Sequence, residues 1–572
     1  MNVDLTPTRR FWRLLKPDSK DIRNVYVYSI FNGLVGLSLP LGIQAIVNLI
    51  QGGQTNTAWV VLLILVVGGV VFTGILQIFQ LKIVENLQQK IFSRAAFEFA
   101  HRIPRIRMEQ LYRHYAPELM NRFFDVMSLQ KGLPKILIDF SSAMIQLVFG
   151  LLLLSVYHSF FVMFSLILVF MVVMIFVLTA KRGLVTSLAE SKRKYQVAHW
   201  LEELARTMTT FKLAGRTSLP LSKVNHHVND YLDARNAHFA VLVQQYWLMT
   251  IFKGLVALGL LAIGGWLVME QRINIGQFVG AEIIVLTIMS SVEKLILTME
   301  TIYDVLTGLE KIGQVTDMDL ENHKGIDLLT QCDDCGLNLS LKNVDFAYPD
   351  SHLILNNLTL DIKGDEKWLV TGPSGSGKST LLQVIAGIFQ IKAGEISYNN
   401  LPQGNLNLRS VRSAIGECLE SEQLFEGTLL ENITTGRSRA TFDNVKWAVE
   451  NVGLTDFLKS CAEGYESRIE PQGKKLPRSI VQKILLARAI ADMPKLLLIE
   501  NILDAISAEE GIRITNFLTH PDRPWTLVAV SSNHYLASKV DKIAVLQSGS
   551  IKAIGPYSEL DPSLITQIAA SA

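Results

Sequence analysis

A glycine-rich stretch at residues 371–380 is the clearest chemical signature in this sequence. It matches the pattern G-x-x-x-x-G-K-[ST], which is typical of a phosphate-binding loop. Glycines let backbone N–H groups approach phosphate oxygens, and the positive end of a following helix attracts the same anion. The apolar residues 368–370 predict a strand that leads in, and residues 381–386 predict a helix that leads out. The residues expected to bind the nucleotide are Gly372, Pro373, Ser374, Gly375, Ser376, Gly377, Lys378, Ser379 and Thr380.

Two side chains of this loop carry separate roles in the expected chemistry. Lys378 is expected to reach the β- and γ-phosphates, and the Ser379 hydroxyl is placed to bind Mg²⁺. The motif therefore predicts binding of a nucleoside triphosphate together with Mg²⁺. Hydrolysis requires further residues, which are considered below.

The composition indicates a membrane protein of more than one domain. The chain has 572 residues, of which 49% are hydrophobic, and the apolar excess lies before residue 300. A formal net charge of +2 does not indicate a particular binding partner, and no sequence feature predicts binding to nucleic acid. Residues 1–20 are polar and basic without an apolar core, so no cleaved signal peptide is expected. Cys332 and Cys335 form a CxxC pair without a second pair, which favours reduced thiols over a zinc site.

Six membrane spans are predicted before residue 300. The uncharged residues 140–180 exceed the length of one span, so they predict two helices that turn near Tyr157, His158 and Ser159. Pro40 predicts a kink in the first span. The long segments 82–135 and 181–239 show helical periodicity and are expected to extend the membrane helices into the cytosol. The spans are expected at about residues 25–50, 58–81, 136–156, 159–180, 240–269 and 275–297.

The distribution of basic residues predicts the orientation of these spans. The outer loops 51–57, 157–159 and 270–274 contain one basic residue between them, Arg272, whereas the opposite segments contain many. The positive-inside rule therefore places both termini in the cytoplasm. Lys253 and Glu282 lie within apolar runs, where charges are either functional or hydrated by snorkelling. We expect them at different depths and hence not paired with each other.

The cytosolic half resembles the ATP-binding cassette (ABC) exporters in several motifs around the glycine-rich loop. Residues 343–349 resemble the family's strand whose aromatic residue, here Tyr348, stacks on adenine; a core tyrosine is the competing interpretation. Residues 424–433 are similar to L-F-x-G-T-I-x-E-N-I, and residues 486–489 match L-A-R-A. In the membrane half, residues 115–122 and 206–212 resemble the two coupling-helix regions, and the closest likeness is to peptide and protein secretion exporters without their N-terminal peptidase domain.

The resemblance implies an α-helical membrane domain with six transmembrane helices, followed by an α/β P-loop NTPase domain. It implies ATP and Mg²⁺ as the ligands of that second domain. The expected division is a cytoplasmic segment at 1–21, the transmembrane domain at 22–315, a linker at 316–336 and the nucleotide-binding domain at 337–572.

The sequence departs from the family at most positions that carry catalysis. Asn501 stands where the family has its general base and cannot accept a proton, and Ser532 stands at the switch histidine. Glu500 remains as a ligand of Mg²⁺ through water, and Glu420 replaces the glutamine of the Q-loop as a second candidate ligand. A shift of one residue would make Glu500 the base, but Pro494 argues against it. The signature that faces the partner's nucleotide is altered to Leu476, Pro477, Arg478, Ser479 and Ile480.

These departures lead to two hypotheses of function. The first is a subunit of a bacterial inner-membrane ABC exporter that binds Mg·ATP, hydrolyses it slowly or with a partner's help, and moves a peptide, protein or lipophilic substrate. The second is a non-hydrolysing, nucleotide-gated regulatory membrane protein with the same fold. Both require a second half-transporter subunit, as a homodimer or heterodimer, and contact with lipid; a periplasmic adaptor is a further candidate partner. Arg478 is either a substitute charge for the partner's γ-phosphate or a solvated arginine at a helix start.

Overall fold

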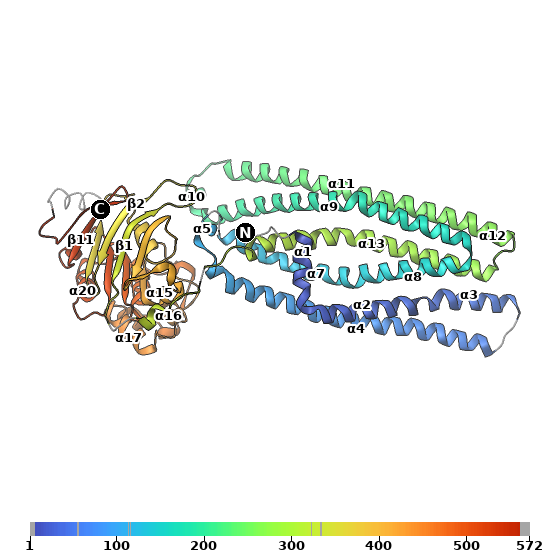
Figure 1. The fold of residues 1–572 in the computed structure, drawn as a ribbon, viewed down its shortest axis with the longest axis horizontal. Coiled ribbons are helices and arrows are strands. Elements are labelled where there is room, and N and C mark those ends of the chain that lie inside the picture. Colours follow the sequence, from blue (N-terminus) through green and yellow to red (C-terminus); the bar gives the residue numbers. More distant parts are fainter. Residues whose placement is uncertain are drawn as a thin grey trace. The chain divides into compact units, whose positions relative to one another are not determined.

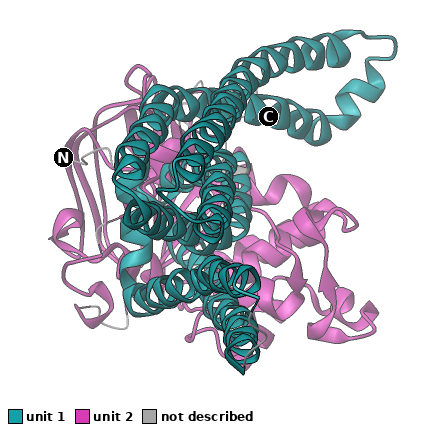
Figure 2. Ribbon diagram, turned by 90° about the vertical axis from the view of Figure 1, so that its right-hand side faces the viewer, with its two compact units in different colours: residues 1–104, 115–318 teal, residues 105–114, 319–572 magenta. Residues whose placement is uncertain are grey.

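The computed structural model describes residues 6–53, 57–112, 114, 116–321, 323–331 and 335–560. The chain forms two compact units, one made of residues 1–104 and 115–318 and the other of residues 105–114 and 319–572 (Figures 1 and 2). The short segment 105–114 thus belongs to the second unit, although both of its chain neighbours belong to the first.

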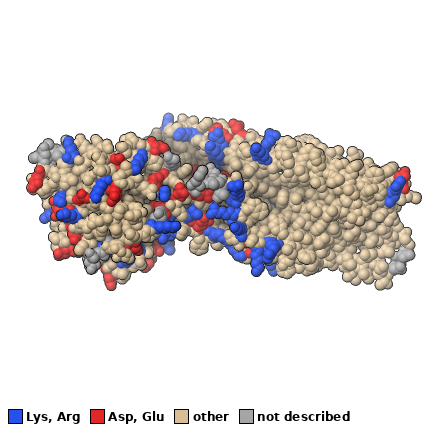
Figure 3. All heavy atoms as spheres, in the orientation of Figure 1, with Lys and Arg blue, Asp and Glu red and all other residues tan. Residues whose placement is uncertain are grey.

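The first unit is built from six helical stretches long and apolar enough to cross a membrane, among the described residues. This confirms the six spans predicted from the sequence. Figure 3 shows that Lys and Arg gather at one border of a large surface with few charges. The six stretches are Pro7–Gln51, Thr57–Arg105, Glu118–Tyr157, Ser159–Arg206, Leu219–Met269 and Ile275–Thr316.

Two helix interruptions fall where the sequence predicts them. Pro40 has no backbone N–H for the carbonyl four residues earlier, and the first stretch is interrupted there, between α2, which ends at Gly36, and α3, which begins at Ser38. The backbone of His158 is extended, with φ of −163°, and it separates α8 from α9. Its side chain accepts the backbone N–H of Phe160 and so caps the new helix.

The helices of the first unit continue well beyond the apolar segments, as the periodicity predicts. Short π-helical segments occur at Lys135–Phe140 and Leu260–Gly264. The α-helices are α1 Pro7–Leu15, α2 Ser19–Gly36, α3 Ser38–Gln51, α4 Thr57–Arg102, α6 Ala116–Asn121, α7 Asp125–Pro134, α8 Ser141–Tyr157, α9 Ser159–Arg206, α10 Met208–Leu213, α11 Leu219–Gly259, α12 Gly265–Met269 and α13 Ile275–Thr316.

An ion pair joins two of these helices within the apolar region. The Nζ atom of Lys253 on α11 lies 2.8 Å from a carboxylate oxygen of Glu293 on α13. Charges in an apolar span are costly unless they are paired or hydrated. As expected, Lys253 does not pair with Glu282. Its partner is Glu293, which no sequence pattern predicts.

The second unit contains a six-stranded, mostly parallel sheet of order β12-β11-β3-β10-β9-β6 and a four-stranded antiparallel sheet of order β2-β1-β4-β5. This is the α/β architecture that the sequence predicts. Strands β7 and β8 form a separate two-stranded antiparallel sheet. The strands are β1 Leu339–Phe346, β2 Leu355–Ile362, β3 Lys367–Thr371, β4 Ala393–Tyr398, β5 Leu401–Pro402, β6 Ile415–Cys418, β7 Gly427–Thr428, β8 Arg468–Ile469, β9 Leu496–Glu500, β10 Thr526–Val530, β11 Lys542–Gln547 and β12 Ser550–Gly555.

The strand order places the carboxyl ends of the parallel strands β3, β10 and β9 side by side at one edge of the sheet. In the register of the large sheet, Val530 of β10 pairs with Val370 of β3 on one side and with Glu500 of β9 on the other. Ligands of open α/β sheets bind at such carboxyl ends. The helices of this unit are α5 Met108–Leu111, α14 Lys378–Ile385, α15 Leu408–Ala414, α16 Leu429–Thr434, α17 Phe442–Asn451, α18 Thr455–Ser460, α19 Arg478–Ile490, α20 Ala508–Leu518 and α21 His534–Ala537.

Candidate nucleotide-binding site

The glycine-rich loop follows β3 and leads directly into α14, as the sequence predicts. Gly372, Gly375 and Gly377 have positive φ angles of 146°, 77° and 102°, which side chains other than glycine rarely adopt. A Cβ atom on Gly372 would lie 2.0 Å from the carbonyl oxygen of Leu546. The loop conformation thus requires glycine, which explains the motif in terms of this backbone.

The ammonium group of Lys378 lies inside the loop. It donates hydrogen bonds of 2.8 Å to the carbonyl oxygens of Gly372 and Pro373. Burial lowers the pKa of Lys378, and the negative charge of nearby Glu500 opposes this shift. A cation surrounded by loop backbone at a helix N-terminus fits a phosphate chain.

Glu500 is the last residue of β9 and is buried. One of its carboxylate oxygens accepts the backbone N–H of Glu420 at 3.1 Å, so the turn after β6 is joined to the end of β9. The Glu420 side chain itself is exposed. Carboxylate and hydroxyl oxygens are ligands that Mg²⁺ prefers, so Glu500 and Ser379 fit a Mg·nucleotide by their chemistry.

Asn501 and Ser532 follow the ends of the neighbouring strands β9 and β10. Asn501 adopts a left-handed conformation with φ of 47°, and its backbone N–H donates to the carbonyl of Val530 at 2.9 Å. Asparagine tolerates this conformation better than most residues. Ser532 lies two residues before His534, which is exposed at the start of α21. The structure therefore places Asn501 and Ser532 at the same sheet edge as the glycine-rich loop.

Residues 476–480, which the sequence predicts as the signature segment, lie at the start of α19 and not at the sheet edge. Pro477 precedes the helix and makes no side-chain capping hydrogen bond, and Arg478 is its first residue; both are exposed. Helix α19 packs against α16, α17 and β6. Burial and the negative charge of Glu420 raise the pKa of Asp504, and the positive charge of Arg478 opposes this shift.

The side chain of Tyr348 is half-buried beside the glycine-rich loop. Its hydroxyl hydrogen-bonds with the Thr380 hydroxyl at 3.0 Å and donates to the Gln383 amide oxygen at 3.1 Å. The ring of Tyr112 stacks on it, with centroids 4.9 Å apart and planes inclined by 11°. Tyr112 was not predictable from the sequence, because nothing in its local pattern distinguishes it from an ordinary surface tyrosine.

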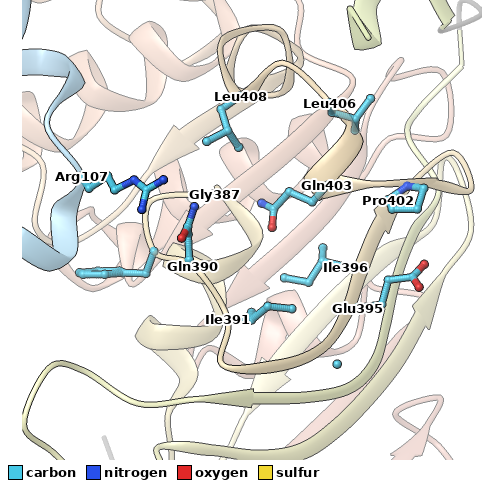
Figure 4. Close-up of a pocket in the computed structure, with 13 residues that line it drawn as sticks. Arg107, Gly387, Gln390, Ile391, Glu395, Ile396, Pro402, Gln403, Leu406 and Leu408 are labelled. Carbon is cyan, nitrogen blue, oxygen red and sulfur yellow. The ribbon is translucent and has the colours of Figure 1, made fainter. Parts of the chain in front are cut away.

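A cavity of about 390 Å³ lies in the same unit, next to the segment 105–114 (Figure 4). Arg107 lines it together with residues between Gly387 and Leu408. Figure 4 shows the Arg107 guanidinium extending toward Gly387 and Gln390. None of the residues that line this cavity belongs to the glycine-rich loop, so the two features are separate.

Arg488, the arginine of the L-A-R-A motif, has a structural role. Its guanidinium donates to the carbonyl of Asn432 at 2.7 Å and lies 3.5 Å from the Glu422 carboxylate. Burial, followed by the charge of Glu417, raises the pKa of Glu422 to about 7. Arg488 thus joins α19 to α16 and to the loop that follows Glu420.

The cysteine pair in the linker is only partly described. Cys332 lies outside the described residues, and Cys335 is an exposed free thiol. Within the described part of the chain, no cluster of three or more histidine, cysteine, aspartate or glutamate side chains is arranged to hold a metal ion.

Comparison with known families assigns both units. The model of the ABC transporter transmembrane region matches residues 23–292, and the model of the ABC transporter domain matches residues 355–503. The fold and these matches define an ABC transporter. The chain carries a transmembrane region and an ABC ATPase domain on one polypeptide. The ATPase domain implies ATP binding.

Individual relatives share only a low sequence identity with this chain. The chain is 26% identical over 307 residues to an uncharacterized ABC transporter ATP-binding protein of Bacillus subtilis, and the match covers 53% of each chain. It is 28% identical over 326 residues to a multidrug efflux ATP-binding/permease protein of Mycobacterium tuberculosis, covering 57% of this chain and 26% of the relative. These matches span about half or less of the relatives' lengths.

A solved structure shares the whole fold. The structure of a bacterial Atm1-family ABC exporter with ATP bound matches with a TM-score of 0.84 and covers 96% of this chain and 98% of the other. The sequences are 17% identical, so this likeness concerns the fold alone.

Proposed function

We propose that this chain is the ATP-binding, membrane-spanning subunit of an ABC exporter. The observation that carries the proposal is the glycine-rich loop, with Lys378 inside it and Glu500 nearby, in a chain whose described residues also form six helical stretches long and apolar enough to cross a membrane. The relative named as a multidrug efflux ATP-binding/permease protein supports transport as the activity. A lipophilic molecule, a peptide or a protein remains the proposed substrate.

The proposed site works through this chain's own side chains. Lys378 neutralises phosphate charge, the loop N–H groups bind phosphate oxygens, and Tyr348 stacks on the adenine ring. Ser379, Glu500 and Glu420 are proposed to hold Mg²⁺, which supplies charge neutralisation at the phosphates. Asn501 orients water but accepts no proton, so we propose that hydrolysis is slow.

A second subunit is part of the proposal. The segment from Leu476 to Ile480 spans the start of α19, and its residues Pro477 and Arg478 are exposed, which leaves it accessible to another chain. We propose that it faces the partner's nucleotide in a homodimer or heterodimer. The membrane is proposed to be a bacterial inner membrane with both termini in the cytoplasm, supported by the basic residues at the border of the apolar surface. Lipid and a periplasmic adaptor are further proposed partners, and no nucleic acid is.

The alternative is a regulatory membrane protein that binds ATP without hydrolysing it. The asparagine at the base position and the serine at the switch position favour this second candidate. Steady ATP hydrolysis that Lys378→Ala abolishes would support the transporter. Tight ATP binding without turnover, in the presence of every candidate partner tested, would support the regulator.

A further inference from the structure

One face of the Tyr348 ring, the ring that is proposed to stack on adenine, is in contact with Tyr112. The two rings are nearly parallel, with an interplanar angle of 11° and a centroid distance of 4.9 Å. Phe346 and Phe389 lie nearly perpendicular to the Tyr348 ring, at 85° and 87°. Tyr112 is therefore the one ring, among those recorded against Tyr348 in the described part of the chain, that stacks parallel to it.

The space between the two tyrosine rings does not admit a nucleotide base. Stacked aromatic planes lie about 3.5 Å apart, so a base between two rings needs them roughly 7 Å apart. The observed 4.9 Å is too short for that arrangement. A base that stacks on this face of Tyr348 must replace Tyr112.

We infer that Tyr112 competes with the adenine base for Tyr348, and that Tyr112 is thereby a further determinant of nucleotide affinity in this chain. The inference rests on the proposed role of Tyr348. Tyr112 is 53% exposed, so its ring can move away toward solvent without opening the protein core. The competing contact is weak enough for a base to replace, because one aromatic pair contributes little energy.

The segment that carries Tyr112 is also held to the same unit by other contacts. Ile106 pairs with Leu320 in a short antiparallel β-bridge. The Glu109 carboxylate accepts the backbone N–H of Gln390 at 2.7 Å. Gln390 lies one residue after Phe389, in the stretch that follows the helix of Lys378. These attachments keep Tyr112 near Tyr348, which gives the stacking contact a high effective concentration.

The competition predicts opposite effects for two alanine variants of the full chain in lipid vesicles. Tyr112→Ala removes the competing ring and should tighten Mg·ATP binding by about two- to tenfold, whereas Tyr348→Ala removes the stacking surface and should weaken it. Tyr112→Phe keeps the ring and serves as the matched control with wild-type affinity. In a Tyr348→Ala background, Tyr112→Ala should have no effect on affinity.

The affinity for inorganic tripolyphosphate distinguishes competition between Tyr112 and the base from a change of the whole site. It binds the glycine-rich loop without a base, so Tyr112→Ala should leave its affinity unchanged. Weaker or unchanged ATP binding in Tyr112→Ala would overturn the inference, and so would an equal gain for tripolyphosphate. If Tyr348→Ala binds ATP as the wild type does, the proposed stacking role of Tyr348 fails instead.

Discussion

A carboxylate oxygen of Glu500 accepts the backbone N–H of Glu420 at 3.1 Å, which fixes the end of β9 against the turn after β6. We predict that Glu500→Gln weakens the Mg²⁺ dependence of ATP binding by on the order of 10–100-fold, because a water-mediated ligand loses its charge. Calorimetric titration of ATP with and without Mg²⁺ measures this. Glu420→Gln keeps the backbone N–H and should have a smaller effect. Equal Mg²⁺ dependence in wild type and Glu500→Gln would contradict the metal assignment.

The ion pair between Lys253 and Glu293 should matter for the stability of the membrane helices. Lys253→Met leaves the carboxylate without its partner, and we expect a loss of about 2–3 kcal/mol, seen as a lower thermal midpoint in lipid nanodiscs. The double exchange Lys253→Glu with Glu293→Lys restores the pair and should recover most of the loss. A double variant no more stable than the single one would show that the pair itself contributes nothing.

The predicted orientation can be measured with single cysteines in a chain whose four native cysteines are replaced by serine. A cysteine at Gln271 should react with a membrane-impermeant maleimide in intact cells. Cysteines at Arg105 and Lys192 should react only after permeabilisation, because the basic segments lie in the cytoplasm. Labelling of the Arg105 position in intact cells would reverse the proposed orientation.

The raised pKa of Glu422 predicts a pH dependence of stability. Between its ordinary pKa of 4.5 and about 7, the folded chain holds a proton that the unfolded chain has released. Stability should therefore fall as the pH rises through this window, by up to about 3 kcal/mol. Glu422→Gln should show a smaller fall in thermal midpoint between pH 5 and 8. Glu426→Gln, an exposed carboxylate on the same loop, should keep the wild-type profile; an unchanged profile in Glu422→Gln would contradict the prediction.

Features that depend on short stretches of chain were predictable from the sequence. The glycine-rich loop, the six spans and the breaks near Pro40 and His158 follow from local composition and backbone chemistry. Glu293 as the partner of Lys253 was not predictable, because the pairing depends on how α11 and α13 align. The contact between Tyr112 and Tyr348 was not predictable for the same reason, since it joins a segment between membrane helices to the residues that follow β1, far away in the sequence. The strand order that brings Glu500, Asn501 and Ser532 to one edge also becomes visible only in the fold.

The central claim is that this site binds Mg·ATP but hydrolyses it poorly. Asn501→Glu supplies a base but leaves Ser532 and the altered signature unchanged, and catalytic groups that act as a unit respond weakly to a single repair. A combined variant adds Ser532→His and rebuilds the signature with Pro477→Ser, Arg478→Gly, Ser479→Gly and Ile480→Gln. As a control, each variant is also made with Lys378→Ala added, which should abolish ATP binding and any turnover.

The direct test is phosphate release at saturating Mg·ATP from the full chain in lipid vesicles. We predict a wild-type rate below roughly 1 s⁻¹, the lower end of ordinary enzyme rates. The single repair should change it little, and the combined repair should raise it by about 10²-fold or more. A wild-type rate in the ordinary range that is lost in Lys378→Ala would contradict the claim, and would require a catalytic base elsewhere, with Glu500 and Glu420 as the first candidates.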